Sequence, residues 1–361
     1  MEHTDSPGSA GQAAPRDKRP DEAGDEGRRP TIASVASAAA VSRQTVSNVI
    51  NAPHRVGEQT RQRVERAIAE ARYRPLKTAQ ALRTRRSNLI AVGIPDAGGA
   101  RNLLIGGFLH VLTAEAQRRG YRILLVTGTD DAAEIKAYDD LLTDYDIEAL
   151  VLTATHRGDQ RIPWLVNRGT RFVTFGRPWG TKATHPWVDV DGAGGVREAT
   201  EHLIEQGHER IAFIGWPGGS GVGEDRLSGW EQACRTAGLP RRDLSRRTGE
   251  GLEQGRQACG SLLDSPKPPT AIVCVSDTIA VGAWVEVTAR GGRPGRDVAI
   301  IGFDDLPTAS MIGLSSVAQP LTAAAAVCVD SVQSPHRTTG MGGTAPLQVL
   351  LAPKLIVRAS G

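Results

Sequence analysis

The ten residues 42–51, SRQTVSNVIN, combine side chains of two kinds. Arg43, Gln44 and Asn48 carry groups that can form paired hydrogen bonds with base edges in the major groove of DNA. The apolar side chains recur at helical spacing on the opposite side, namely Val46, Val49 and Ile50. The segment is therefore predicted to be a helix that packs on its apolar side and reads DNA with its polar side.

Such a reading helix needs neighbours to hold it, and the flanking residues predict a helix-turn-helix. Apolar residues within 32–39 recur at i, i+3, i+4 and i+7, as on one face of a helix that Thr31 would cap. Residues 40–41 would form the turn, and Ser42 would cap the reading helix. A third helix is predicted over 58–71, ended by the YRP sequence that follows.

The predicted DNA-binding domain spans residues 31–76. Its other polar side chains are expected to contact phosphates or to buttress the reading helix: Thr31, Ser42, Thr45, Ser47 and Arg55. Residues 77–88 then form a linker that is basic and rich in helix formers. A helix this short is unstable alone in water, so we expect it to order only against a partner.

Charge is distributed unevenly along the chain. The formal net charge is +3, yet residues 31–88 hold 11 lysines and arginines against three acids. Residues 1–30 hold five basic and seven acidic side chains, which leaves a net charge of −3 for residues 89–361. A basic head on a mildly acidic body predicts a polyanionic partner at one end only, and the alternative is a solvated charged surface.

Three further features bear on the compartment. Residues 1–30 have Met1 as their only sizeable apolar side chain, so they are predicted to be a disordered tail. The four cysteines show no C-x-x-C spacing, which favours buried reduced thiols. No apolar run reaches the roughly 18 residues of a membrane helix, and no apolar signal core is present, so we expect a cytoplasmic protein without a membrane partner.

From residue 89 onward the pattern becomes one of alternating strands and helices. The run LIAVGI at 89–94 is continuous and apolar, as is typical of a buried parallel strand. Two such alternating series predict an α/β protein with two parallel-sheet lobes and a cleft between them, where a small ligand would bind. The first lobe is assigned to about 89–187 plus 320–335, and the second to about 188–319 plus 346–361.

Catalysis has little support in this chain. G-x-S-x-G, H-E-x-x-H, the P-loop and G-x-G-x-x-G are all absent from it. The adjacent acids Asp304 and Asp305 would point to opposite faces of a strand, which favours one ligand contact and one structural contact over acid/base chemistry. We therefore predict no enzymatic activity, no cofactor and no metal site, with a sugar-processing enzyme as the alternative that would require such a constellation.

Residues 31–94 resemble the LacI/GalR family of bacterial transcription regulators. The matching motifs of the head and linker are TIASVA, VSRQTVSNVIN, RVGEQTRQRV, YRP and AQALRTRRS. In the body, VDVDG, DRLSGW, SDTIAVGA and GFDD resemble the core of these regulators, which is similar to periplasmic sugar-binding proteins. The resemblance covers about 31–320 plus 347–360, and it implies a lambda-repressor-like head on a periplasmic-binding-protein-like core.

The resemblance also assigns roles to particular residues. It implies that residues 77–88 form a hinge helix that pairs with that of a second subunit on DNA. Ala79 and Leu82 would contact DNA there, with Leu82 wedged into the minor groove at the operator centre. Effector contacts fall to Arg226 and Asp304, whose guanidinium and carboxylate could together bind the vicinal hydroxyls of a sugar.

Four more residues are predicted to complete the effector pocket: Arg177, Trp187, Ser276 and Asp277. Ser276 occupies a position where sugar-binding members often have asparagine, and Asp277 follows it. Arg177 and Trp187 lie at the predicted edge of the first lobe. For the tryptophans of this region the alternative is packing in the core or between the lobes.

The chain departs from the family pattern at several positions. The family usually has an acid in place of Ser34, which predicts the loss of a capping box, and glycine in place of Ala40, where a left-handed alanine costs about 1 kcal/mol. The sequence GEGL at 249–252 lacks the pocket aromatic of related proteins, which argues against a stacked purine as ligand. At the carboxyl end we expect a truncated helix over 321–326, a mobile loop, and a final strand at 347–357.

The expected function is that of a sequence-specific DNA-binding transcription regulator, a repressor. It would bind a palindromic operator in double-stranded DNA as a homodimer, with a tetramer as the alternative assembly. A small-molecule effector, a sugar, would bind between the lobes, change the spacing of the paired hinges and so alter operator affinity. The alternative is a solute-binding receptor of sugar-binding type, which would carry an export signal and lack the basic head.

Overall fold

The computed structural model describes residues 30–73, 87–95, 101–333 and 346–361. The chain divides into two compact units, residues 1–84 and 85–361, called here the head and the core. Three predictions cannot be compared with the structure: the disordered tail, the hinge helix and the mobile loop before the last strand. They fall largely on residues 1–29, 74–86 and 334–345, which lie outside the described residues.

The head is the helix-turn-helix that the sequence predicts. Val35, Val46 and Val64 come one from each of its three α-helices, and all three side chains are fully buried against one another. These contacts orient the second helix so that its polar side faces away from the small core. The elements are α1 (Ile32–Ala38), α2 (Arg43–Asn51), the 3-10 helix η1 (Pro53–Arg55) and α3 (Glu58–Glu70).

Both N-caps are present, and one expectation about them is wrong. Thr31 Oγ1 accepts a hydrogen bond from the N–H of Ser34 at 3.2 Å, and Ser34 Oγ accepts one from the N–H of Thr31 at 2.9 Å. The capping box expected to be absent is therefore formed, because the serine hydroxyl reaches back to the cap as glutamate usually does. Ser42 caps α2 as predicted, through the N–H of Thr45 at 3.0 Å.

The turn between α1 and α2 places Ala40 in the left-handed region, with φ of 50°. A Cβ atom is unfavourable in this conformation, which is why glycine is the usual residue there. Arg63 of α3 donates from Nε to the carbonyl of Ala39 at 2.9 Å, directly beside the turn. This bond ties the strained turn to the third helix.

Replacing Ala40 with glycine should stabilise the head by about 0.5–1 kcal/mol, because relief of the left-handed alanine exceeds the added freedom of the unfolded chain. Hydrogen exchange of the α1 and α2 amides in the full chain measures this change. Ala38→Gly, at the exposed end of α1, is the matched control and should lower protection. Reduced protection in Ala40→Gly would contradict the strain at this turn.

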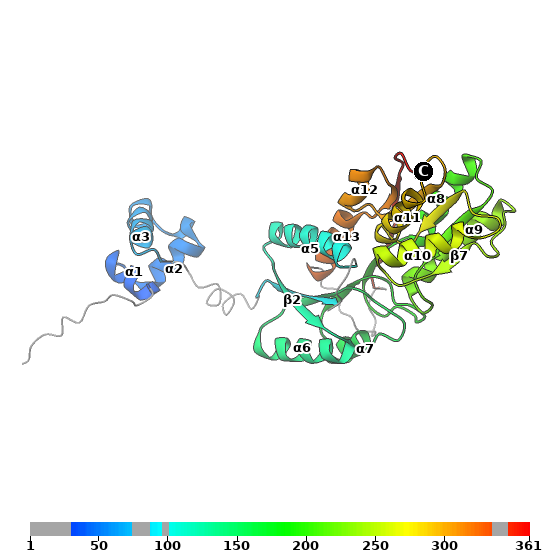
Figure 1. Cartoon of the computed structure of the whole chain (residues 1–361). Helices are drawn as coiled ribbons and strands as arrows, with labels where there is room; N and C mark the ends of the chain where they lie inside the picture. The colour runs from blue at the N-terminus through cyan, green and yellow to red at the C-terminus, as the bar shows by residue number, and fades with distance from the viewer. Residues whose placement is uncertain (1–29, 74–86, 96–100, 334–345) are drawn as a thin grey trace, which may run out of the picture. The chain divides into compact units, whose positions relative to one another are not determined.

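The core is built on two six-stranded sheets, one in each lobe (Figure 1). The first sheet has the order β11-β5-β4-β3-β1-β2 and is entirely parallel. Its strands are β1 (Leu89–Pro95), β2 (Arg122–Gly128), β3 (Ala149–Leu152), β4 (Phe172–Phe175), β5 (Trp187–Val190) and β11 (Gln348–Leu351). Within the run at 89–94, residues 90–93 pair with a parallel strand on each side, which explains the continuous apolar character of the run.

The second sheet has the order β12-β10-β9-β8-β6-β7, and only β12 runs antiparallel to its neighbour. Its strands are β6 (Ile211–Gly215), β7 (Ser245–Arg247), β8 (Ala271–Cys274), β9 (Ala299–Asp304), β10 (Ser315–Ala318) and β12 (Lys354–Ile356). The bilobed, parallel-sheet architecture predicted from the alternating pattern is thus confirmed.

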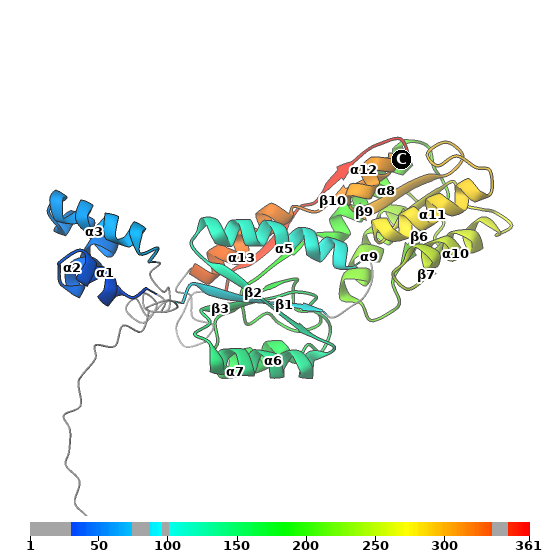
Figure 2. The same ribbon diagram turned by 60° about the vertical axis from the view of Figure 1, so that its left-hand side comes forward.

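Helices cover both faces of the first sheet. Figure 2 shows α5 (Arg101–Arg118) and α13 (Leu321–Gln333) side by side on one face, and α6 (Asp131–Asp144) and α7 (Arg161–Arg168) on the other. In the second lobe α8 packs with α9, and α10 packs with α11. The second-lobe helices are α8 (Gly192–Glu205), α9 (Gly221–Thr236), α10 (Leu252–Leu263), α11 (Asp277–Ala289) and the short α12 (Pro307–Ile312).

The segments at the ends of the lobes are divided between the two sheets differently from the prediction. β5 extends the first sheet to Val190, and β11 pairs with β5 there, although residues 346–361 were all assigned to the second lobe. The expected single strand at 347–357 is two strands in different sheets, because Pro353 cannot donate to a ladder and interrupts the apolar run. The chain therefore crosses between lobes after β5, after β10 and after β11.

The helix expected to stop near residue 326 continues as α13 to Gln333. Its buried residues recur at helical spacing along the whole length and pack on the first sheet: Ala324, Ala325, Cys328, Val329 and Val332. Burial of this apolar stripe outweighs the weak helix preference of valine.

Two smaller expectations can be compared with the structure. All four cysteines are buried and none forms a disulfide, as predicted. Within the described ranges, no helix combines the length and the apolar character needed to cross a membrane.

Candidate DNA-reading surface and effector cavity

Helix α2 presents its predicted reading side chains away from the core of the head. Arg43 and Gln44 are exposed and Asn48 is half-buried, whereas Val46 and Val49 are buried. Gln44 donates from Nε2 to Oδ1 of Asn48 at 3.0 Å, one helical turn away. This bond aligns two amides side by side, in an arrangement that suits hydrogen bonding to a flat base edge.

The predicted supporting residues surround this face in different roles. Thr31 and Ser42 serve as the N-caps already described, and the hydroxyls of Ser42 and Thr45 lie 2.9 Å apart. Ser47 accepts from the side-chain amide of Asn51 at its carbonyl, at 2.7 Å. Arg55 is exposed at the end of η1. Ala79 and Leu82, predicted to enter the minor groove, lie outside the described residues.

The core encloses a cavity of about 430 Å³ that is lined from both lobes. This volume falls within the range of about 300–1,000 Å³ that is usual for small-molecule sites. Its walls come largely from segments that follow the carboxyl ends of the parallel strands, where ligands of α/β proteins bind. Phe175 and Trp179 belong to the first-lobe wall, and Trp216, Arg226 and Asp304 to the second.

Arg226 and Asp304, the two residues predicted to contact the effector, both line this cavity. The guanidinium of Arg226 donates to the carbonyl of Val275 at 2.6 Å, lies 3.6 Å from the ring centroid of Phe303, and approaches Asp304 Oδ1 at 3.6 Å. Burial raises the pKa of Asp304 to about 6, although Arg226 and a hydrogen bond from Gln319 oppose the shift. Both groups are thus held where a ligand can meet them.

Backbone conformation directs Asp304 and Asp305 apart. Both residues have positive φ, 109° and 49°, a conformation that aspartate tolerates better than most residues. Asp304 turns to the cavity, whereas Asp305 forms a salt bridge with Arg358 at 2.7 Å. The sequence-based expectation of one ligand-facing and one structural carboxylate agrees with this placement.

The other predicted pocket residues do not line the cavity. Trp187 begins β5, at the amino end of the strand, whereas the cavity meets that strand at Asp189 and Val190. Arg177 lies behind the wall, where its Nε donates to Asp189 at 2.5 Å and its Nη2 approaches Asp225 at 3.3 Å. Arg177 therefore positions two carboxylates that do line the cavity.

Ser276 and Asp277 also stand behind the wall. Ser276 caps α11 and donates its hydroxyl to Glu250, a lining residue. Asp277 is fully buried and accepts hydrogen bonds from the N–H of Leu306 at 2.7 Å and the hydroxyl of Ser316 at 2.6 Å. Asp277 thus braces the segment after β9, and burial, aided by the nearby charge of Asp304, raises its pKa to about 7.

Several lining residues escaped the sequence analysis. Trp179 and Trp216, and not Trp187, supply the tryptophan faces of the cavity. Trp216 directly follows β6, so its position at the carboxyl end of a strand was a usable signal. Glu250 lies in the GEGL segment where the family pattern placed an aromatic, and Gln319 follows β10. No sequence periodicity marked these last two.

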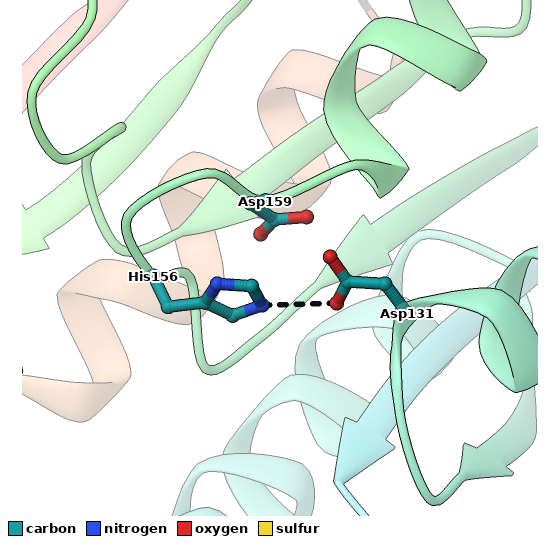
Figure 3. Close-up of side chains that lie close together, drawn as sticks. All are labelled: Asp131, His156 and Asp159. Carbon is teal, nitrogen blue, oxygen red and sulfur yellow. Dashed lines mark hydrogen bonds and ion pairs between the residues drawn. The ribbon is translucent and has the colours of Figure 1, made fainter.

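The side chains of Asp131, His156 and Asp159 lie close together in the first lobe (Figure 3). Asp131 and His156 line the cavity. The potential ligand atoms of the three residues lie within 4.8 Å of one another, a spacing compatible with a metal site. The buried guanidinium of Arg161, however, already pairs with Asp159 at 2.7 Å, Glu134 at 2.9 Å and Asp131 at 3.6 Å. We therefore treat this group as an ion-pair network.

Hydrogen bonds tune two members of this network. Burial alone would raise the pKa of Asp131, but bonds from the N–H of Gln160 and from His156 lower it. Burial alone would lower the pKa of His156, but the carbonyl of Arg157 and the carboxylate of Asp131 raise it. Asp131 and His156 therefore stabilise each other's charged forms.

The chain combines a helix-turn-helix that exposes a hydrogen-bonding face with a core that has a ligand-sized cavity between two α/β lobes. This combination defines a ligand-binding transcription regulator. The model of bacterial regulatory proteins of the lacI family matches residues 31–75, and the periplasmic binding protein-like domain matches residues 200–361. The HTH-type transcriptional regulator CelR of Thermobifida fusca is 34% identical over 345 residues, covering 92% of this chain and 99% of CelR. The chain belongs to the LacI family of DNA-binding transcription regulators.

Two solved structures show the same architecture. A complex of the regulator CelR with cellobiose is 31% identical, with a TM-score of 0.66 and coverage of 92% of this chain and 100% of that one. The lac repressor dimer bound to operator and the anti-inducer ONPF is 25% identical, with a TM-score of 0.79 and coverage of 92% and 99%. The family and fold expected from the sequence motifs are thus confirmed.

The buried carboxyl of Asp277 predicts a pH-dependent stability. Because its pKa is about 7 in the folded chain and near 3.8 in the unfolded chain, the folded state retains a proton between these values. Stability should therefore fall as pH rises through this window, by up to about 1.4 kcal/mol per pH unit from this group. Asp304 acts in the same direction, so Asp277→Asn should reduce the slope without abolishing it.

Denaturant unfolding of the full chain at pH 5 and pH 7, followed by tryptophan fluorescence, measures this slope. Asp297→Asn is the matched control, because that exposed carboxyl has a lowered pKa and stays ionised throughout the window. A wild-type slope in Asp277→Asn would exclude the buried carboxyl as its source.

Proposed function

We propose that this regulator is a repressor that binds a palindromic operator as a homodimer, with a tetramer as the alternative assembly. We further propose that a sugar bound in the core cavity controls its affinity for DNA. The observation that carries the effector part is the pair formed by Arg226 and Asp304 in the wall of the cavity. A guanidinium and a carboxylate together offer donors and acceptors to neighbouring hydroxyls, as sugars present them. The likeness to a cellobiose-bound CelR supports the same ligand class.

Tryptophan faces support a sugar further. Trp179 and Trp216 line the cavity, and their flat apolar surfaces suit the C–H faces of a pyranose ring. Arg226 is 4% exposed and its Nε has no hydrogen-bond partner among the described residues, as is also true of Trp179 Nε1. A ligand with several hydroxyl oxygens would supply acceptors near both groups.

In the head, we assign base reading to Arg43, Gln44 and Asn48. Thr31, Ser42, Thr45, Ser47 and Arg55 are assigned to phosphate contacts or support, and Ala79 and Leu82 to the minor groove, on the sequence resemblance. The paired amides of Gln44 and Asn48 favour recognition of adenine, whose edge offers one donor and one acceptor. Such a regulator would act where the chromosome lies, in the cytoplasm.

Coupling between the two functions requires that the ligand favour one arrangement of the lobes. Arg177 of the first lobe contacts Asp225 of the second, beside the cavity. Because that pair spans the lobes, a ligand that displaces or completes it would bind the two arrangements with different affinity. The effector's influence on operator affinity is proposed to arise from this difference.

Two alternatives are less well supported. A solute-binding receptor without a DNA role would not need the exposed, pre-aligned amides of α2. A sugar-processing enzyme would need a proton donor and acceptor poised over a scissile bond, whereas the carboxylates of the first-lobe rim are committed to Arg161. We therefore propose no catalytic role and no cofactor.

Arg226→Lys should lower effector affinity at least tenfold, because lysine keeps the charge but loses the planar fork that binds two oxygens at once. Cellobiose and a panel of other sugars would first be screened against the wild-type protein by thermal shift, and the best ligand then titrated calorimetrically. Arg293→Lys is the matched control, since Arg293 is exposed and pairs with Asp297 on the surface. Without sugar, the operator affinity of Arg226→Lys should match that of the wild type. If its sugar affinity were undiminished, Arg226 would not be part of the effector site.

Gln44→Ala should cost about 1–3 kcal/mol of operator binding while leaving non-specific DNA binding nearly unchanged. Arg55→Ala should instead weaken both equally and reduce the salt dependence by about one phosphate contact. Fluorescence anisotropy at several salt concentrations, with an operator selected from random DNA by the wild-type protein, separates the two effects. Equal losses on both DNAs for Gln44→Ala would remove it from base reading.

A further inference from the structure

The effector cavity is lined by an excess of acid, with seven carboxylate side chains and two arginines. Most of these carboxylates are compensated by groups that the protein itself supplies. Asp131 and Glu134 share Arg161, and Asp304 faces Arg226. Asp189 and Asp225 share Arg177 behind the wall.

Two lining carboxylates have no cationic partner in the salt bridges of the described residues: the exposed Asp130, which accepts from the N–H of Ala133, and Glu250, the half-buried one of the two. In the described part of the chain it takes part in no salt bridge, although its side chain is half-buried and lines the cavity. Its hydrogen-bond partners are neutral: Trp216 donates from Nε1 at 2.5 Å, and the hydroxyl of Ser276 lies 3.0 Å from both carboxylate oxygens. Neutral donors orient a carboxylate but do not cancel its charge.

The position of Glu250 is fixed by elements that belong to the sheet edge. Trp216 follows β6, and Ser276 is the N-cap of α11, where its Oγ also accepts from the N–H of Ile279 at 3.3 Å. A carboxylate has room for about four hydrogen bonds, and these partners leave lone pairs available on the cavity side. Glu250 is therefore a pre-oriented acceptor without a salt bridge of its own. Its charge acts on the buried guanidinium of Arg226, but that guanidinium already faces Asp304, and its Nε has no partner among the described residues.

We propose that Glu250 sets the chemical class of the effector: it binds a protonated amine carried on a polyhydroxylated ring, and phosphorylated or carboxylated sugars are excluded. The amine supplies the missing positive charge, while the ring hydroxyls meet Arg226 and Asp304. An added anion would instead meet six to seven carboxylates within a partly desolvated cavity, where repulsion is weakly screened. This inference rests on the proposed function of the cavity as a sugar site.

The test uses sugars that differ in one group. Glucose, glucosamine and glucose 6-phosphate form one series, and cellobiose, the β-1,4-linked glucosamine disaccharide and phosphorylated cellobiose form the other. Each is titrated calorimetrically at pH 7 into the full-length wild-type protein, into Glu250→Gln and into Glu253→Gln. Glu253 is the matched control, because it lies three residues further on, at the surface, paired with Arg256.

In at least one series the wild type should bind the amino sugar about tenfold or more tightly than the neutral sugar, the range expected of one charge-assisted hydrogen bond, and the phosphate should show no binding. Glu250→Gln keeps the shape and removes the charge, so it should abolish the preference, measured as the ratio of the amino-sugar affinity to the neutral-sugar affinity of the same variant. Glu253→Gln should behave as wild type. A thermal melt equal to wild type checks that Glu250→Gln is folded.

Three results would overturn the inference. If the wild type bound neutral or phosphorylated sugars as tightly as the amino sugar, or more tightly, the cavity would still be a sugar site but the proposed amine contact would be wrong. A preference for the amino sugar that survives in Glu250→Gln would assign the amine to another carboxylate. Absence of binding by every sugar in the wild type, neutral ones included, would contradict the proposed sugar site itself and the inference with it.

Discussion

The burial of one guanidinium sets the requirements for the rest of the effector site. Arg226 on α9 is 4% exposed, so its charge must be compensated within the protein. The compensation comes from elements far apart in the chain, because the carbonyl of Val275 follows β8 and Asp304 ends β9. These contacts can form together only where the carboxyl ends of the strands meet, and Phe303 then packs against the face of the guanidinium.

The same edge of the sheet carries the next layer of support. Asp277 at the start of α11 holds the segment after β9 through Leu306 and Ser316, and Gly302 is required there because a Cβ atom would lie 2.1 Å from the Asp277 carboxylate. The turn that presents Asp304 is therefore built from behind by a buried acid. Three crossings of the chain bring the first lobe to the opposite wall, and Arg177 joins the two lobes through Asp189 and Asp225.

The carboxylates around the cavity differ in whether an arginine balances their charge. The first-lobe rim compensates its acids with Arg161, and the interlobe contact does so with Arg177, so both regions are locked as ion-pair networks. Glu250 is held by neutral donors alone. This difference between a carboxylate paired with an arginine and one held by neutral donors is the basis on which we propose that Glu250 selects the ligand.

Local patterns in the sequence determined most of the elements and the head, and family motifs indicated two residues that line the cavity. The caps at Thr31 and Ser42, the apolar side of α2 and the strained turn at Ala40 depend on neighbours within a few residues, so spacing alone reveals them. The family motifs located Arg226 and Asp304 because each lies within a short motif, DRLSGW or GFDD, that resembles the family. The length of α13 was misjudged, since packing against the first sheet and not propensity decides where that helix ends.

Only the tertiary structure decided which side chains reach the cavity. Trp179 and Trp187 lie on the same connection between β4 and β5. Trp179 follows the carboxyl end of β4 and Trp187 begins β5, and the cavity forms at the carboxyl ends of the strands. Likewise β11 and β12 look like one apolar strand until pairing assigns them to different sheets. Partner choice between strands and the direction of a side chain at a strand end depend on residues far away along the chain, and no local periodicity encodes them.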